Sequence, residues 1–113
     1  MKLFIYVLNR QEKIDEILAG FIEIGMTGAT IVDSVGMGRI LAQEVPVFAG
    51  FQSLLSGSRP YNKTIMSVVD SDEKLADAIG LIEEICGPFN EPGSGIAFTL
   101  PLDAVYGLKP ELE

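Results

Sequence analysis

The residue types that most often carry out catalysis are scarce in this sequence. The 113-residue chain contains no histidine and one cysteine, Cys86. A Ser-His or Cys-His nucleophile pair therefore cannot form within one chain, and the common zinc sites and an internal disulfide are also excluded. Cys86 follows an apolar helical stripe, which favours a role as a small core residue. We expect no catalytic residues, no metal site and no enzymatic activity.

Two pairs of neighbouring carboxylates are the next candidates for acid–base chemistry. Asp70 and Asp72 lie at the start of a predicted helix, whereas Glu83 and Glu84 lie within it. Carboxylates at a helix start stabilise the positive end of its dipole, and those on its outer surface are solvated. Both pairs thus have a structural explanation, and nothing in the sequence supports general acid or base catalysis by them.

Glycine-rich segments are better candidates, for binding. Gly36 and Gly38, with Arg39 beside them, follow a strand-like run, and Gly93 and Gly95 precede another. Glycines at strand ends allow backbone N–H groups to approach an anion closely. An arginine beside them could add a bidentate contact to a phosphate. These segments indicate an anion site, although glycines at strand ends also serve simply as turns.

The charge balance bears on the same question. The net charge is −8, from 8 basic and 16 acidic residues, with a pI of about 4.4. Such a balance argues against nucleic-acid binding, which needs a basic face. Residues 34–69 differ from the rest, because their basic residues outnumber a single acidic one. This segment could concentrate a small anion; alternatively, the acidic charge merely follows two solvated helices.

The elements that would position these residues begin with a strand, a helix and a second strand. Residues 2–8 are mostly apolar and rich in strand-forming types. Asn9 offers an N-cap side chain, and apolar residues then recur at helical spacing from residue 14 to residue 22. Gly25 is placed to end that helix, and residues 29–35 predict the second strand.

The second half of the chain repeats this order. Residues 64–69 predict a strand, and Asp70 with Glu73 fits a capping box. A helical stripe follows and stops at Gly87, before a last strand at residues 96–100.

Two strand–helix–strand units predict an α+β fold of the ferredoxin-like βαββαβ type, with a four-stranded antiparallel sheet and two helices on one face. We expect one domain, residues 1–113. The other sheet face would be bare in a monomer, and the apolar fraction of 48% suggests more apolar surface than one small core hides. We therefore expect self-association through that face. No run is long and apolar enough for a membrane span and no leader opens the chain, which predicts a cytoplasmic protein.

A long segment, at residues 37–62, separates the two units. Connections of this length are usually functional. Apolar residues recur there at the spacing of one helical face, namely Val47, Phe48, Phe51, Leu54 and Leu55. This stripe could dock in a groove of a partner protein, or it could pack against the protein's own subunits.

Several of these motifs resemble those of a known family. Residues 23–32 (EIGMTGATIV), continuing to residues 36–39 (GMGR), are similar to the segment of the PII nitrogen-regulatory signalling proteins that ends their second strand. Residues 93–95 (GSG) followed by Phe98 resemble the loop before their fourth strand, and residues 37–62 lie where that family has its T-loop. The resemblance extends from residue 2 to about residue 109.

The resemblance implies a homotrimer that takes part in signal transduction in nitrogen regulation. Adenine nucleotides (ATP, ADP or AMP) would bind as effectors in the three clefts between neighbouring subunits. The T-loop would change conformation with the bound nucleotide and dock on a partner, either a membrane transporter or a metabolic enzyme. Its docking surface would be the stripe of Phe48, Phe51, Leu54 and Leu55.

Carried over by position, the resemblance also implies a set of ligand-binding residues. They are Thr27, Ala29, Thr30, Gly36, Gly38, Arg39, Gly93, Gly95 and Lys109. The first three would line the adenine pocket, Arg39 would lie near the phosphates, and the glycines before the last strand would give backbone contacts. The sequence departs from the family at Ile40, Ile96 and Gly107, which replace polar or charged contacts. We therefore expect weak nucleotide binding that depends on Arg39.

Three alternatives share parts of this pattern. The first is a PII-like protein that has lost nucleotide binding. The second is an amino-acid-binding module of the ACT type, although residues 9–11 (NRQ) stand where that type has a glycine. The third is a copper-tolerance-like trimer that binds metal, which the absence of histidine disfavours.

Overall fold

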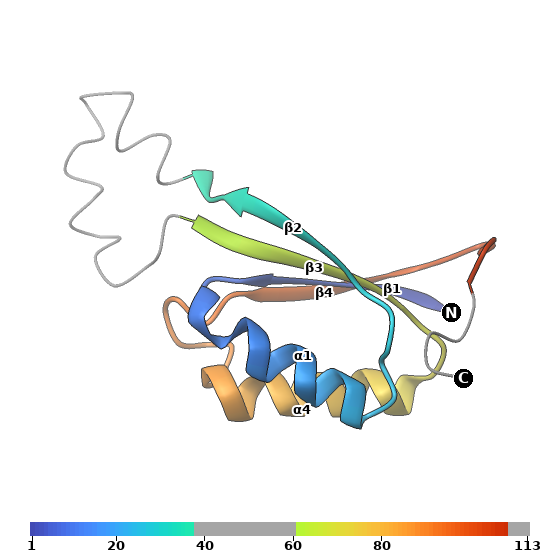
Figure 1. Ribbon diagram of the computed structural model, residues 1–113, viewed down its shortest axis with the longest axis horizontal. Helices are drawn as coiled ribbons and strands as arrows, with labels where there is room; N and C mark the ends of the chain where they lie inside the picture. The colour runs from blue at the N-terminus through green and yellow to red at the C-terminus, as the bar shows by residue number, and fades with distance from the viewer. Residues whose placement is uncertain (38–60, 109–113) are drawn as a thin grey trace.

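The computed structural model describes residues 1–37 and 61–108, which form a sheet with two helices on one of its faces (Figure 1). The elements, in chain order, are β1 (Lys2–Leu8), the 3-10 turn η1 (Gln11–Lys13), α1 (Ile14–Glu23), β2 (Thr30–Val35), β3 (Tyr61–Val69), α4 (Asp72–Cys86) and β4 (Ile96–Pro101). This order confirms the predicted α+β fold with its ferredoxin-like βαββαβ arrangement.

The sheet has four strands in the order β2-β3-β1-β4, and every neighbouring pair is antiparallel. Within β1, Tyr6 lies opposite Ile65 of β3 and Ala97 of β4. β3 begins three residues earlier than the sequence predicts. Residues 61–63 show no apolar pattern, but they pair with residues 33–35 of β2 and so lengthen the strand.

The core lies between the helices and alternate residues of β1. Phe4, Tyr6 and Leu8 are fully buried on the helix side of the sheet. The helices contribute Ile17, Phe21, Ala78, Ile82 and Cys86. Phe4 and Phe21 meet edge to face, with ring centroids 6.3 Å apart. Burying each large apolar side chain of this layer contributes about 1.5–3 kcal/mol to the stability of the fold.

The first helix begins differently from the sequence prediction. Asn9 is not its N-cap, because η1 intervenes and α1 begins at Ile14 without a side-chain cap. The Asn9 side chain instead accepts a hydrogen bond from Nδ2 of Asn62, at 3.3 Å. The predicted end is confirmed: Gly25 follows the helix with a φ of 90°.

The start of α4 also corrects the predicted capping box. The N-cap is Ser71, whose Oγ accepts the Lys74 N–H at 3.1 Å, and Asp70 pairs instead with the Lys74 ammonium at 3.3 Å. Ser71 is the cap because it directly precedes the helix, where its short side chain reaches the third N–H. In the described part of the chain, no helix is both long and apolar enough to cross a membrane.

The sheet face away from the helices carries no charged side chain among the described strand residues. Residues paired across neighbouring strands share a face, so the register assigns each position. The apolar residues of this open face are Leu3, Ile5, Val7, Val32, Met66, Val68, Ile96, Phe98 and Leu100. Those on β4 are 44–58% exposed. The single chain thus has the bare apolar face that the sequence predicts.

Gly80→Ala should stabilise the protein by about 0.5–1 kcal/mol, because alanine favours a helix and a Cβ at Gly80 meets no atom within 4 Å. Gly20→Ala in α1 is the matched control. A Cβ there would lie 2.4 Å from Cδ2 of Leu81 on α4, so Leu81 must move and the gain should be smaller or negative. Urea unfolding followed by circular dichroism measures both. Equal stabilisation at the two sites would contradict the close approach of α1 to Leu81.

Candidate functional site

The two predicted glycine segments lie at the same end of the sheet. We call it the glycine end: here β1 and β2 finish and β3 and β4 begin. Gly36 directly follows β2, and Gly95 directly precedes β4. β2 and β4 are however the two edge strands, three strand spacings apart, or roughly 14 Å. Among the described residues of one chain, Gly36 and residues 93–95 therefore share an end of the sheet but lie at its two opposite edges.

The backbone at Gly95 requires glycine. Its φ is 97°, and a Cβ would lie 2.3 Å from the carbonyl oxygen of Val7. Gly93 also has a positive φ, of 82°. Both values lie in a region that other residues rarely adopt, and we call this segment the glycine loop (residues 93–95). At Gly95 the loop approaches the end of β1 so closely that no larger residue fits at this position.

The side chain of Tyr6, on β1, anchors the glycine loop to the sheet. Its hydroxyl donates a hydrogen bond to the Ser94 carbonyl at 3.2 Å, and its ring packs edge to face on Phe89, with centroids 6.1 Å apart. Burial raises the pKa of the Tyr6 phenol far above its ordinary value, the neighbouring Cys86 thiol adds to this, and the Arg10 charge opposes it. The phenol therefore stays protonated and remains a donor. This hydrogen bond connects the loop to β1, which is an inner strand of the sheet.

Ser94 itself has an unusual side chain. It is 1% exposed, and its Oγ has no hydrogen-bond partner among the described residues. Ser67 is a useful comparison, since it is similarly buried at 4% exposed but donates to the Gly28 carbonyl at 2.6 Å. A buried hydroxyl without a partner loses its hydrogen bonds to water and gains none in return.

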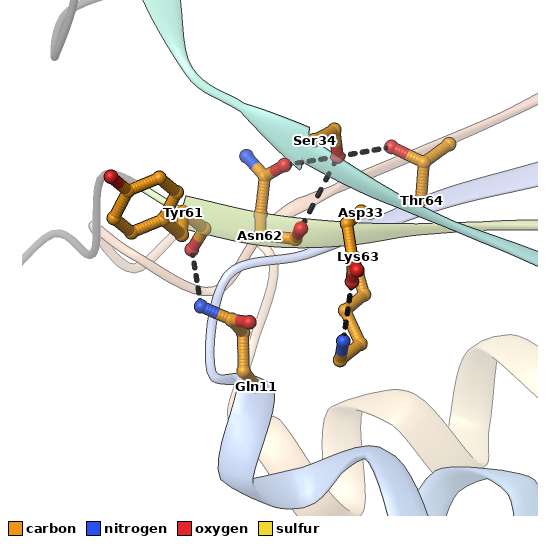
Figure 2. A network of polar contacts seen from close by, with 7 residues as sticks. All are labelled: Gln11, Asp33, Ser34, Tyr61, Asn62, Lys63 and Thr64. Carbon is orange, nitrogen blue, oxygen red and sulfur yellow. Dashed lines mark hydrogen bonds and ion pairs between the residues drawn. The ribbon is translucent and has the colours of Figure 1, made fainter.

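A polar network occupies the open face near the glycine end, as Figure 2 shows. Oγ of Ser34 on β2 contacts the side-chain oxygen of Asn62 and lies 2.8 Å from Oγ1 of Thr64, both on β3. Asn62 is only 7% exposed. On the other side of the ribbon, Lys63 pairs with Asp33 at 2.5 Å. These contacts hold the end of β2 to the start of β3 at the glycine end.

The same network reaches the connection after β1. Nδ2 of Asn62 donates to Oδ1 of Asn9. Nε2 of Gln11 donates to the Tyr61 carbonyl at 3.0 Å (Figure 2). The first two residues of β3 are thus bonded to residues on either side of Arg10. This ties the β1–η1 connection to the base of the long segment.

Thr27, Ala29 and Thr30 lie at the opposite end of the sheet, where β2 begins. All three are exposed. Thr27 lines a pocket of about 320 Å³ together with Ser67, Lys74, Leu108 and neighbouring residues. The structure therefore separates these three residues from Gly36, Gly93 and Gly95 within one chain, although the resemblance assigns all of them to one ligand.

The remaining predicted site residues lie outside the described part of the chain. They are Gly38, Arg39 and Lys109 of the implied phosphate site, and Phe48, Phe51, Leu54 and Leu55 of the implied partner-binding stripe. Of the predicted long segment at residues 37–62, only Met37, Tyr61 and Asn62 are described.

Sequence reasoning missed Tyr6 and the polar network. The alternation of β1 places Tyr6 in the core, but its partner Ser94 is 88 residues away and no local pattern indicates the bond. The same holds for Ser34 and Asn62, which are 28 residues apart. Within residues 1–37 and 61–108, no group of three His, Cys, Asp or Glu side chains is arranged to hold a metal ion.

No protein-family model matches this sequence, and no curated protein matches it.

Ser94→Ala should leave stability unchanged or raise it by up to about 1 kcal/mol, because it removes a buried hydroxyl that has no partner. Ser67→Ala is the matched control and should cost about 1 kcal/mol, since it removes a bonded hydroxyl and leaves the Gly28 carbonyl without that donor. Thermal unfolding of the two variants and the parent measures the difference. A loss at Ser94 as large as that at Ser67 would show that the Ser94 hydroxyl has a partner.

Proposed function

We propose that this protein is a trimeric regulatory protein of the PII type. It binds an adenine nucleotide in the clefts between neighbouring subunits, acts on a partner protein through residues 37–62, and catalyses no reaction. The resemblance of residues 23–39 and 93–98 to that family is the starting point, and three features of the described chain support it.

The observation that carries the proposal is the position of the glycine segments. Gly36 and the glycine loop lie at one end of the sheet but at its two opposite edges. In the proposed ring of copies, a head-to-tail contact brings the β2 edge of one subunit to the β4 edge of the next. Gly36 of one copy and Gly95 of its neighbour can then contact the same ligand. The topology favours a ligand site shared between subunits over one within a single chain.

The open face supports self-association. It is apolar over β1 and β4, with Phe98 in the middle of the edge strand β4 44% exposed. Its described residues carry no charge, although the chain has a net charge of −8. A charge-free apolar face of this kind marks an interface. In a trimer, the three open faces meet around the axis, and the two helices of each subunit remain outside.

The glycine loop suits an anionic ligand. Its backbone is held by the Tyr6 hydrogen bond and by the close approach of Gly95 to Val7, so its conformation exists before a ligand arrives. Backbone N–H groups in positive-φ segments form concave sites for phosphate oxygens. This supports a phosphate-bearing effector over a neutral one.

Phe98→Lys should convert the trimer to monomers, because it places a charge on the open face without disturbing the core. Ala76→Lys on the exposed side of α4 introduces the same charge and should leave the trimer intact. Light scattering at micromolar concentration gives the mass of each. A parent protein that is monomeric under these conditions contradicts the proposed assembly, and a dimeric one favours an ACT-type module.

The parent protein should bind ATP, ADP or AMP with a micromolar or weaker Kd, corresponding to roughly −8 kcal/mol or less favourable. The reason is that Ile40, Ile96 and Gly107 replace polar contacts that the family uses. Isothermal calorimetry with the three nucleotides, and with guanosine diphosphate as a matched control for the base, measures this. Binding of none of them by the trimer would refute the nucleotide part of the proposal and leave a role in protein binding alone.

A further inference from the structure

Arg10 differs from the other described cations in having no carboxylate partner. The four described lysines each form an ion pair, namely Lys2–Asp72 at 3.2 Å, Lys13–Glu16 at 3.5 Å, Lys63–Asp33 at 2.5 Å and Lys74–Asp70 at 3.3 Å. Among residues 1–37 and 61–108, Arg10 makes no such pair. In a chain with 16 acidic residues, a half-buried arginine left without one is available for another anion.

The position of Arg10 is central to the glycine end. It follows β1, and β1 lies between β3 and β4 in the sheet. The connection that carries Arg10 therefore has the start of β3 on one side and the glycine loop on the other. The pairing of Val7 with Ile96 puts the end of β1 directly beside the start of β4.

The backbone around Arg10 is held in place. The preceding residue, Asn9, is bonded to Asn62, and the following residue, Gln11, is bonded to the Tyr61 carbonyl. The Arg10 carbonyl accepts the Lys13 N–H at 2.9 Å. With bonds on both sides of it, the main chain of Arg10 is held at the glycine end, so less backbone freedom is lost when its side chain binds.

Arg10 also lies close enough to Tyr6 for their electrostatic interaction to matter. It acts on the phenol of Tyr6, whose hydroxyl is bonded to the Ser94 carbonyl. Lys74, which lines the pocket at the opposite end of the sheet, is neutralised by Asp70. The described cation best placed for an anion is therefore at the glycine end.

We propose that Arg10 binds the phosphate groups of the ligand held at the glycine loop. This rests on the proposed function and extends it, because it assigns a cationic contact that the resemblance does not supply. Ile96 stands where the family has a lysine, and Arg10, two residues beyond the end of the adjacent strand β1, provides a charge in its place. A guanidinium can donate two parallel hydrogen bonds to a phosphate, which favours a polyphosphate over an uncharged nucleoside.

Calorimetry with ADP, adenosine and inorganic tripolyphosphate on the full-length chain tests this. Arg10→Gln should weaken ADP and tripolyphosphate binding by about 10- to 100-fold and leave adenosine binding unchanged. Arg10→Lys should recover part of the loss, since it restores the charge but not the planar pair of donors. The dependence of ADP binding on salt should also be smaller in Arg10→Gln than in the parent.

Lys13→Gln is the matched control, because Lys13 lies in the same connection but is paired with Glu16. Equal ADP affinity in Arg10→Gln and the parent would overturn the assignment and leave the proposed function standing. An equal loss in Arg10→Gln and Lys13→Gln would overturn it too, since the effect would then be general electrostatics. If tripolyphosphate binds in an Arg10-dependent manner but ADP binds no better, the anion site holds and the nucleotide proposal fails. If neither binds the parent, both are wrong.

Discussion

The pairing of β1 with its two neighbours is the constraint on which the rest of the structure depends. Even-numbered side chains such as Phe4 and Tyr6 face the helices, and odd-numbered ones such as Ile5 face the open side. A slip of one residue in either pairing would turn the core outward, so the register is strongly specified. The same pairing puts the end of β1 beside the starts of β3 and β4. The positions of the core, the open face and the glycine end therefore all depend on the register of β1.

The open face changes character across the sheet, and this affects how it can be covered. Over β1 and β4 it is apolar, whereas near the ends of β2 and β3 it carries Ser34, Asn62 and Thr64. These polar groups are bonded to one another and to Asn9, so a second copy can cover them without leaving them unpaired. The network therefore lets one continuous face combine an apolar area with a hydrogen-bonded polar area at the glycine end.

The regular elements could be predicted from the sequence because their signals are local. The apolar, strand-forming run of residues 2–8 and the helical spacing before Gly87 can be recognised without knowledge of the rest of the chain. The helix starts could not, because several side chains compete for each one: Asn9 bonds to Asn62 on a distant strand, and Ser71 displaces Asp70 as the cap. The candidate site was only partly predictable. Its glycines are visible in the sequence, but the contacts that hold them depend on which strand ends the sheet brings together.

The attachment of the glycine loop to Tyr6 has a consequence for the thermodynamics of recognition. A loop between a helix and an edge strand is ordinarily among the more mobile parts of a domain. Here the hydrogen bond to Ser94 and the ring contact with Phe89 connect it to the strand in the middle of the sheet. Little backbone freedom is then left to be lost when a molecule settles on it. Association at this loop should therefore carry a small unfavourable change in conformational entropy, with most of the ordering already completed when the chain folds.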